Sequence, residues 1–134
     1  MDETARAADG SILSAVAALD ALDGRGLKFT LALQLQEELM ARELNKATAA
    51  FTPVSATART AWPAVATGNW GCGVFGGMVE LKLVLQWMAC SHAGRRMIYF
   101  PFDCPFGQRV VTLGEEMVRK GKLILVFNLS SNAY

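Results

Sequence analysis

The sequence predicts an α/β fold that contains a βαβ unit. Two continuous apolar runs, "PAVAT" at 63–67 and "RRMIYFPF" at 95–102, flank a glycine-rich loop and an apolar helical segment at 78–93. Runs of this kind are typical of parallel strands, and the order strand, loop, helix, strand gives a right-handed crossover. We therefore expect two parallel strands joined by a helix that is covered on more than one side.

Further helices are expected before and after this unit. Ser11 can cap a short helix that Gly24 and Gly26 terminate. Its apolar stripe would comprise Ile12, Leu13, Val16, Leu19 and Leu22. The other expected elements are a helix over 27–50, a connector over 52–62, a helix over 109–120 and a strand over 122–127. The chain is thus expected to divide into an Ala-rich extension with a short helix (1–26) and one domain (27–134).

The composition is that of one globular domain and excludes several kinds of partner. Hydrophobic residues make up 52% of the 134 residues and charged residues 19%, and the net charge is +1. A charge so close to zero gives no broad field for nucleic acid or for an anionic membrane. No apolar run reaches the length of a membrane helix, and Asp2 and Glu3 argue against a signal peptide.

The three cysteines, Cys72, Cys90 and Cys104, lack the paired spacing of a zinc site or redox motif. Reduced thiols and an intracellular protein are therefore expected, in a compartment that the sequence leaves open. His92 is the only histidine, and it lies two residues from Cys90, which places the two side chains on different sides of one helix. We expect neither a metal site nor a cofactor.

The loop "TGNWGCGVFGG" at 67–77 is the most specific feature of the sequence. A loop that leads from a parallel strand into a helix offers unpaired backbone N–H groups and the positive end of the helix dipole, which favour phosphate. Gly71, Gly73, Gly76 and Gly77 would let an anion approach the backbone and would permit positive φ angles. A purely structural interpretation is that these glycines only allow close packing.

Two ligand classes fit this loop. The letters "GCGVFG" satisfy G-x-G-x-x-G, and Asp103 follows the next strand, near where a Rossmann domain places the acid that binds ribose. A Rossmann-type dinucleotide-binding module is therefore one alternative. A Walker phosphate loop is excluded, because no Lys followed by Ser or Thr comes after the glycines.

The wider sequence favours a different family. "RELNKA" at 42–47, the string "PAVATGNWGCGVFGG" at 63–77, "LK" at 81–82 and the aromatics at 99–102 closely resemble the carboxyl-terminal part of the catalytic domain of poly(ADP-ribose) glycohydrolase, over about residues 40–120. The resemblance implies a partial macrodomain-type α/β/α fold with ADP-ribose or its polymer as ligand. The implied diphosphate contacts, mostly through the backbone, are Gly71, Cys72, Gly73, Val74, Phe75 and Gly76. Asn69 and Phe75 would lie beside the ribose and Phe102 beside the nucleoside.

The catalytic signature of that family is not present at its usual spacing. The family carries a triple glycine followed by Gln-Glu-Glu, whose second Glu is the acid/base. Here Glu37 and Glu38 occupy such a "QEE", but the upstream Gly24-Arg25-Gly26 is not a triple glycine and lies nine residues before it, and Arg42 follows far too soon. Both carboxylates are expected on a solvated helix face, with Glu38 paired to Arg42.

These observations predict a poly(ADP-ribose) glycohydrolase-like protein that is catalytically inactive and serves as a structural subunit of a larger assembly. A vestigial diphosphate-binding loop would remain. The first alternative is an active glycohydrolase, either a fragment or completed by another chain, that cleaves ribose–ribose bonds. The second is the Rossmann-type module. An unpaired sheet edge and a largely apolar central helix argue for protein partners in each case.

Overall fold

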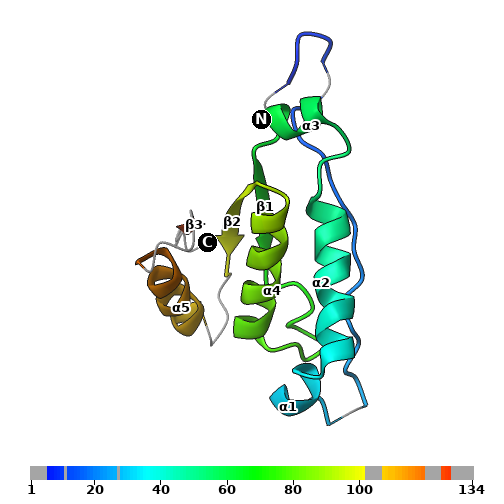
Figure 1. Ribbon diagram of the computed structural model, residues 1–134, viewed down its shortest axis with the longest axis vertical. Helices are drawn as coiled ribbons and strands as arrows, with labels where there is room; N and C mark the ends of the chain where they lie inside the picture. Colours follow the sequence, from blue (N-terminus) through cyan, green and yellow to red (C-terminus); the bar gives the residue numbers. More distant parts are fainter. Residues whose placement is uncertain (1–5, 11, 27, 102–106, 120–124, 128–134) are drawn as a thin grey trace, which may run out of the picture.

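The structure is a computed structural model that describes residues 6–10, 12–26, 28–101, 107–119 and 125–127 (Figure 1). Its elements, in chain order, are α1 (Leu31–Gln34), α2 (Glu37–Phe51), α3 (Ala56–Ala61), β1 (Ala64–Gly68), α4 (Val79–His92), β2 (Arg96–Phe100), α5 (Gly107–Arg119) and β3 (Leu125–Phe127). Among these residues, no helix is both long enough and apolar enough to span a bilayer.

The three strands form one parallel sheet in the order β1-β2-β3. Ala64 pairs with Arg96 and Gly68 with Phe100, so the first two strands are in register from end to end. Met97–Tyr99 pair on the other side with β3. The predicted βαβ unit is therefore confirmed, with α4 as its crossover helix, and the helix and strand expected near the carboxyl end are also found.

The core lies between the sheet and α4. A single cluster of buried side chains contains Ala47, Phe51, Val65, Val79, Leu83, Ala89, Cys90, Met97, Tyr99 and Val110. It joins α2, α4 and α5 to one face of the sheet, and α2 packs along α4 on the side away from the strands (Figure 1). This arrangement explains why α4 is apolar on nearly every side.

The two crossovers place α4 and α5 on the same face of the sheet. Consecutive parallel strands joined by right-handed crossovers have that consequence, and Val110 of α5 accordingly lies in the same cluster as Leu83 of α4. The helices α2, α4 and α5 thus pack in one buried cluster with a single face of the sheet. On the opposite face Ala66 is exposed, and Ile98 and Phe100 are half-buried.

The prediction of a helix over 11–22 is wrong, because the described residues of this segment form no helix. Residues 14–23 have no regular secondary structure, and Ile12 forms an isolated antiparallel bridge with Arg6. Val16, which the helical stripe would bury, is 96% exposed. Helix propensity is a weak preference that tertiary contacts override, and here backbone groups of Leu19 and Leu22 bond to side chains of other elements.

The helix expected over 27–50 is two helices separated by a turn. Thr30 caps the short α1, and Gln36 is the N-cap residue of α2. Leu31 and Leu35 are each about half exposed, because the turn removes them from the stripe that continues along α2. The connector expected over 52–62 contains α3, whose N-cap Ser55 accepts a hydrogen bond from the amide of Ala58.

Candidate functional site

The glycine loop joins the carboxyl end of β1 to the amino end of α4, as the sequence predicts. It closes on itself through three backbone hydrogen bonds, Cys72 N–H to Asn69 O, Gly76 N–H to Gly73 O and Gly77 N–H to Gly71 O, at 2.9–3.0 Å. Gly71 and Gly76 have φ angles of +76° and +72°, which side chains disfavour. The loop is a compact series of turns rather than an extended connection.

One side of the loop is open. The amide groups of Gly73, Val74 and Phe75 donate to no partner within the part of the chain described. Gly73 is exposed, and a Cβ atom added to it would meet nothing within 4 Å. Consecutive backbone donors in a loop that leads into a helix amino terminus can bind an anion.

The other side of the loop is packed against residues 19–24 and Phe29. A Cβ on Gly71 would lie 2.5 Å from the Cβ of Ala21, and one on Gly77 would lie 2.7 Å from the carbonyl of Gly71. The carbonyl of Leu19 accepts a hydrogen bond from the indole of Trp70. Close packing therefore accounts for Gly71 and Gly77, whereas it gives no reason for Gly73.

Phe75, which the resemblance places beside the ribose, is half-buried at the edge of the loop. Its carbonyl accepts a hydrogen bond from the amide of Gly24 at 3.0 Å. The guanidinium of Arg25 lies 5.1 Å from the centre of its ring, within the range of a cation–π contact. The same guanidinium lowers the pKa of Asp23 by hydrogen bonding to its carboxylate.

Asn69 connects the ends of two strands. Its side-chain oxygen accepts a hydrogen bond from the hydroxyl of Tyr99 at 2.8 Å, and its amide nitrogen donates to the carbonyl of Pro101. Tyr99 is fully buried, so its hydroxyl fixes the orientation of the Asn69 side chain from the core side. Phe102, which follows Pro101 and was predicted to contact the nucleoside, lies outside the described residues, as does Asp103.

Two buried glutamines that sequence reasoning missed hold the ends of the loop. Gln34 donates to the carbonyls of Phe29 and Gly76 and accepts from the amide of Met78. Gln86 donates to the carbonyl of Gly68 and is 0% exposed. Gln86 could have been identified from the sequence, because it is a polar residue within the apolar helix expected over 78–93. Nothing in the sequence around Gln34 indicates that its side chain is buried.

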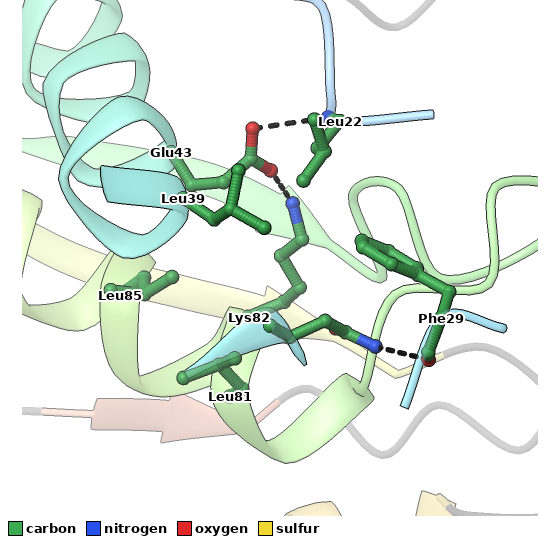
Figure 2. A pocket seen from close by; sticks show the side chains of 8 residues that line it. Leu22, Phe29, Leu39, Glu43, Leu81, Lys82 and Leu85 are labelled. Carbon is green, nitrogen blue, oxygen red and sulfur yellow. Dashed lines mark hydrogen bonds and ion pairs between the residues drawn. The ribbon is translucent and has the colours of Figure 1, made fainter. Parts of the chain in front are cut away.

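A buried ion pair lies beneath the loop and was also missed. Lys82 of α4 contacts Glu43 of α2, and their side chains are 3% and 5% exposed. Both residues line a pocket whose other lining residues are apolar except for Gln34: Leu22, Phe29, Gln34, Leu39, Leu81 and Leu85 (Figure 2). Burial lowers the pKa of Lys82 to about 8, and Arg42 acts in the same direction. The Glu43 carboxylate opposes this shift.

The predicted catalytic candidates lie elsewhere on α2. Glu37 and Glu38 are exposed in its first turn, where a negative charge favours the helix dipole. The expected pairing of Glu38 with Arg42 is wrong, because Arg42 instead hydrogen-bonds to Asp20 and Glu43. Neither candidate carboxylate contacts the loop in the part of the chain described.

No group of three or more His, Cys, Asp or Glu residues among the described residues is placed to hold a metal ion. Cys90 is buried within α4, which raises the pKa of its thiol to about 12. Cys72 is half-exposed in the glycine loop, and His92 is exposed in the last turn of α4. Cys104 lies outside the described residues.

A parallel sheet with a glycine-rich loop after its first strand defines a partial α/β protein of the macrodomain type. The chain belongs to the family described as poly(ADP-ribose) glycohydrolase, macro domain fold, whose carboxyl-terminal catalytic model matches residues 1–106. This match confirms the resemblance and the fold. It starts at residue 1 rather than near residue 40, and it favours a macrodomain over the Rossmann alternative.

Individual relatives agree with the family match. The chain is 33% identical over 129 residues to poly(ADP-ribose) glycohydrolase 2 of Caenorhabditis elegans, covering 89% of this chain and 25% of that protein. It is 67% identical over 39 residues to probable poly(ADP-ribose) glycohydrolase 2 of Arabidopsis thaliana, covering 28% of this chain and 8% of that protein. The chain therefore spans a quarter or less of the length of these relatives.

Proposed function

We propose that this chain is a poly(ADP-ribose) glycohydrolase-like protein that binds the diphosphate of ADP-ribose and has no glycohydrolase activity by itself. The observation that carries the proposal is the open row of amides at Gly73, Val74 and Phe75. These amides belong to the loop that leads into the amino terminus of α4, and Asn69 and Phe75 belong to the same loop. Backbone donors beside an aromatic face suit a nucleoside diphosphate.

The proposed inactivity rests on the surroundings of Glu37 and Glu38. Glycosidic bond cleavage needs a carboxyl group held at the scissile bond in a partly desolvated setting. Both side chains are exposed in the first turn of α2, and no contact among the described residues fixes either of them. These two carboxylates therefore interact favourably with the dipole at the amino terminus of α2 and lack the fixed, desolvated position that an acid/base catalyst needs.

The proposed role as a subunit rests on the incompletely covered sheet. Parallel sheets are normally covered on both faces, yet Ala66 is exposed on the face away from α4. β1 is also an edge strand of the described sheet, and edge strands offer unpaired backbone groups to other chains. A protein partner that extends the sheet from β1 would cover this surface.

One observation favours the alternative of an active enzyme completed by another polypeptide. Gln34 lies two residues before the "QEE" and bonds to the loop at Gly76 and Met78, so Glu37 and Glu38 start only one turn away from a loop contact. A second chain could enclose this region. In that case turnover would require the partner.

ADP-ribose binding tests the proposed ligand. Gly73→Val should abolish the calorimetric binding signal, because it places a branched side chain on the open side without a clash inside the protein. Ala49→Val, at an exposed position near the far end of α2, is the matched control and should bind as the wild type does. Equal affinity of wild type and Gly73→Val would contradict the loop as the binding site.

Polymer hydrolysis separates the inactive protein from the enzyme. The purified chain should release no ADP-ribose from poly(ADP-ribose). Turnover that disappears in Glu38→Ala but persists in Ala49→Val, an exposed position of the same helix outside the "QEE", would establish the enzyme instead.

A further inference from the structure

We infer that Lys82 and Glu43 are positioning residues that fix the shape of the diphosphate loop from beneath, and this inference rests on the proposed function of that loop. Neither residue lies at the open amides of Gly73, Val74 and Phe75. They act on the opposite side, where the loop closes. The pair is shown in Figure 2, with Glu43 between Leu22 and Lys82.

Lys82 forms the floor under the closure of the loop. The loop closes where the amide of Gly77 donates to the carbonyl of Gly71. A Cβ atom on Gly71 would lie 3.3 Å from the Lys82 Nζ, and one on Gly77 would lie 3.2 Å from its Cε. The absence of side chains at these two glycines thus lets the backbone rest directly on the lysine.

Trp70 gives Lys82 a third contact with the loop. The ammonium lies 4.0 Å from the centre of the indole ring, which is a favourable cation–π distance. The indole N–H of Trp70 in turn donates to the carbonyl of Leu19 at 3.3 Å. Lys82 therefore supports both the first turn of the loop and its closing residue.

Glu43 determines where the ammonium can be. Its carboxylate contacts Lys82 through one oxygen, and through the other accepts hydrogen bonds from the Leu22 amide at 3.0 Å and from Arg42. A buried charge separated from its partner is strongly destabilising, so the Lys82 ammonium is held next to the Glu43 carboxylate. One carboxylate thereby joins α2, α4 and the segment that packs on the loop.

The pair acts by position and not by attracting the ligand. An ammonium next to a carboxylate has no net charge, and the field of such a pair falls off steeply with distance. The expected effect of losing Lys82 is therefore a loosened loop whose amides no longer converge on one anion. This distinguishes Lys82 from a surface lysine that would bind phosphate directly.

The experiment compares Lys82→Ala with Val110→Ala, a cavity variant that lowers the stability of the same buried cluster from α5 rather than from α4. Two readouts are measured below the unfolding temperature of both variants. One is the rate at which iodoacetamide alkylates Cys72, followed by peptide mass mapping so that the other thiols do not interfere. The other is the calorimetric Kd for ADP-ribose.

We expect Lys82→Ala to raise both the alkylation rate of Cys72 and the Kd for ADP-ribose by about tenfold. Val110→Ala should change neither by more than about twofold. Lys82→Met retains the unbranched stem and should recover part of both losses; should Lys82→Ala fail to fold, Lys82→Met is compared with Val110→Ala instead. Equal readouts for the lysine and valine variants would overturn the inference.

The two proposals can fail separately. If the wild type binds no ADP-ribose, the proposed function is wrong, and the alkylation rate of Cys72 alone decides whether Lys82 orders the loop. If the wild type binds and the lysine variants bind equally well with an unchanged alkylation rate, only the positioning role is wrong.

Discussion

The side-chain oxygen of Gln34 accepts a hydrogen bond from the amide of Met78 over 2.8 Å. A residue of α1 thereby satisfies a backbone donor at the start of α4, more than forty positions along the chain. The amide nitrogen of Gln34 also donates to the carbonyls of Phe29 and Gly76. The short helix α1 thus places the Gln34 side chain within hydrogen-bonding distance of both ends of this contact, at Phe29 and at Gly76 and Met78.

Removal of Gln34 should destabilise the protein through these lost bonds. Gln34→Ala leaves buried backbone groups without partners, and we expect the free energy of unfolding to fall by about 2 kcal/mol. Gln36→Ala removes the same side chain two residues later, where it is exposed and makes no capping bond, and it should cost less than about 0.5 kcal/mol. Urea unfolding measures both. Similar losses for the two variants would contradict the role of Gln34.

The buried pair of Glu43 and Lys82 should show strong coupling in a double-mutant cycle. Glu43→Leu should lower the free energy of unfolding by about 3–5 kcal/mol, because the Lys82 ammonium remains buried without its carboxylate. Lys82→Met should cost less, because Arg42 still hydrogen-bonds to Glu43. The double variant should lose less than Glu43→Leu alone. The exposed pair of Arg25 and Asp23 is the control, and its coupling should be much weaker because solvent screens it.

An acidic residue at position 78 should stabilise α4. Met78 is the N-cap residue, and its side chain accepts no hydrogen bond from the helix. Met78→Asp supplies a capping oxygen and a favourable charge, for an expected gain of about 1 kcal/mol in chemical unfolding. Met88→Asp makes the same replacement at an exposed position inside the helix and should give no gain. A loss of stability in Met78→Asp would show that the methionine packs there for another reason.

Cys90 should make the protein less stable at alkaline pH. Burial raises the pKa of its thiol from 9.0 to about 12, so the folded state retains a proton that the unfolded state releases. The contribution of the thiol is complete below pH 9 and is lost as the pH rises toward 12. The pKa of Lys82 shifts in the opposite direction, from 10.5 to about 8. This shift makes the free energy of unfolding rise with pH between about 8 and 10.5, which overlaps part of the range over which the Cys90 contribution falls.

The difference between wild type and Cys90→Ala isolates the thiol. Over pH 9–11 the stability of the wild type should fall relative to the variant by at most about 1.4 kcal/mol per pH unit. Guanidinium unfolding at each pH provides the values, with Cys72→Ala as the control. A constant difference between wild type and Cys90→Ala would contradict the raised pKa.

The unit from β1 to β2 could be predicted from the sequence because its signals are local. "PAVAT" and "RRMIYFPF" are apolar runs of strand length, and the glycines between β1 and α4 interrupt regular structure wherever they occur. The open side of the loop also follows from local chemistry, since Gly73 needs no tertiary contact to leave its amide accessible.

The segment before α1 could not be predicted in this way. Its alanines and spaced leucines favour a helix, but the carbonyl of Leu19 and the amide of Leu22 bond to Trp70 and Glu43. Those partners lie far away along the chain. Periodicity within a window of residues carries no information about them.

The sequence by itself therefore determined the order of strand, glycine loop and helix, and with it the family. The sequence also placed Glu37 and Glu38 on a solvated helix face, where the structure finds them. Only the tertiary structure decided that Gln34, Glu43 and Lys82 support the loop. The physical reason is that strands and turns follow from backbone conformation and local hydrophobic pattern, whereas the burial of a polar side chain depends on partners that only the completed fold brings within hydrogen-bonding distance.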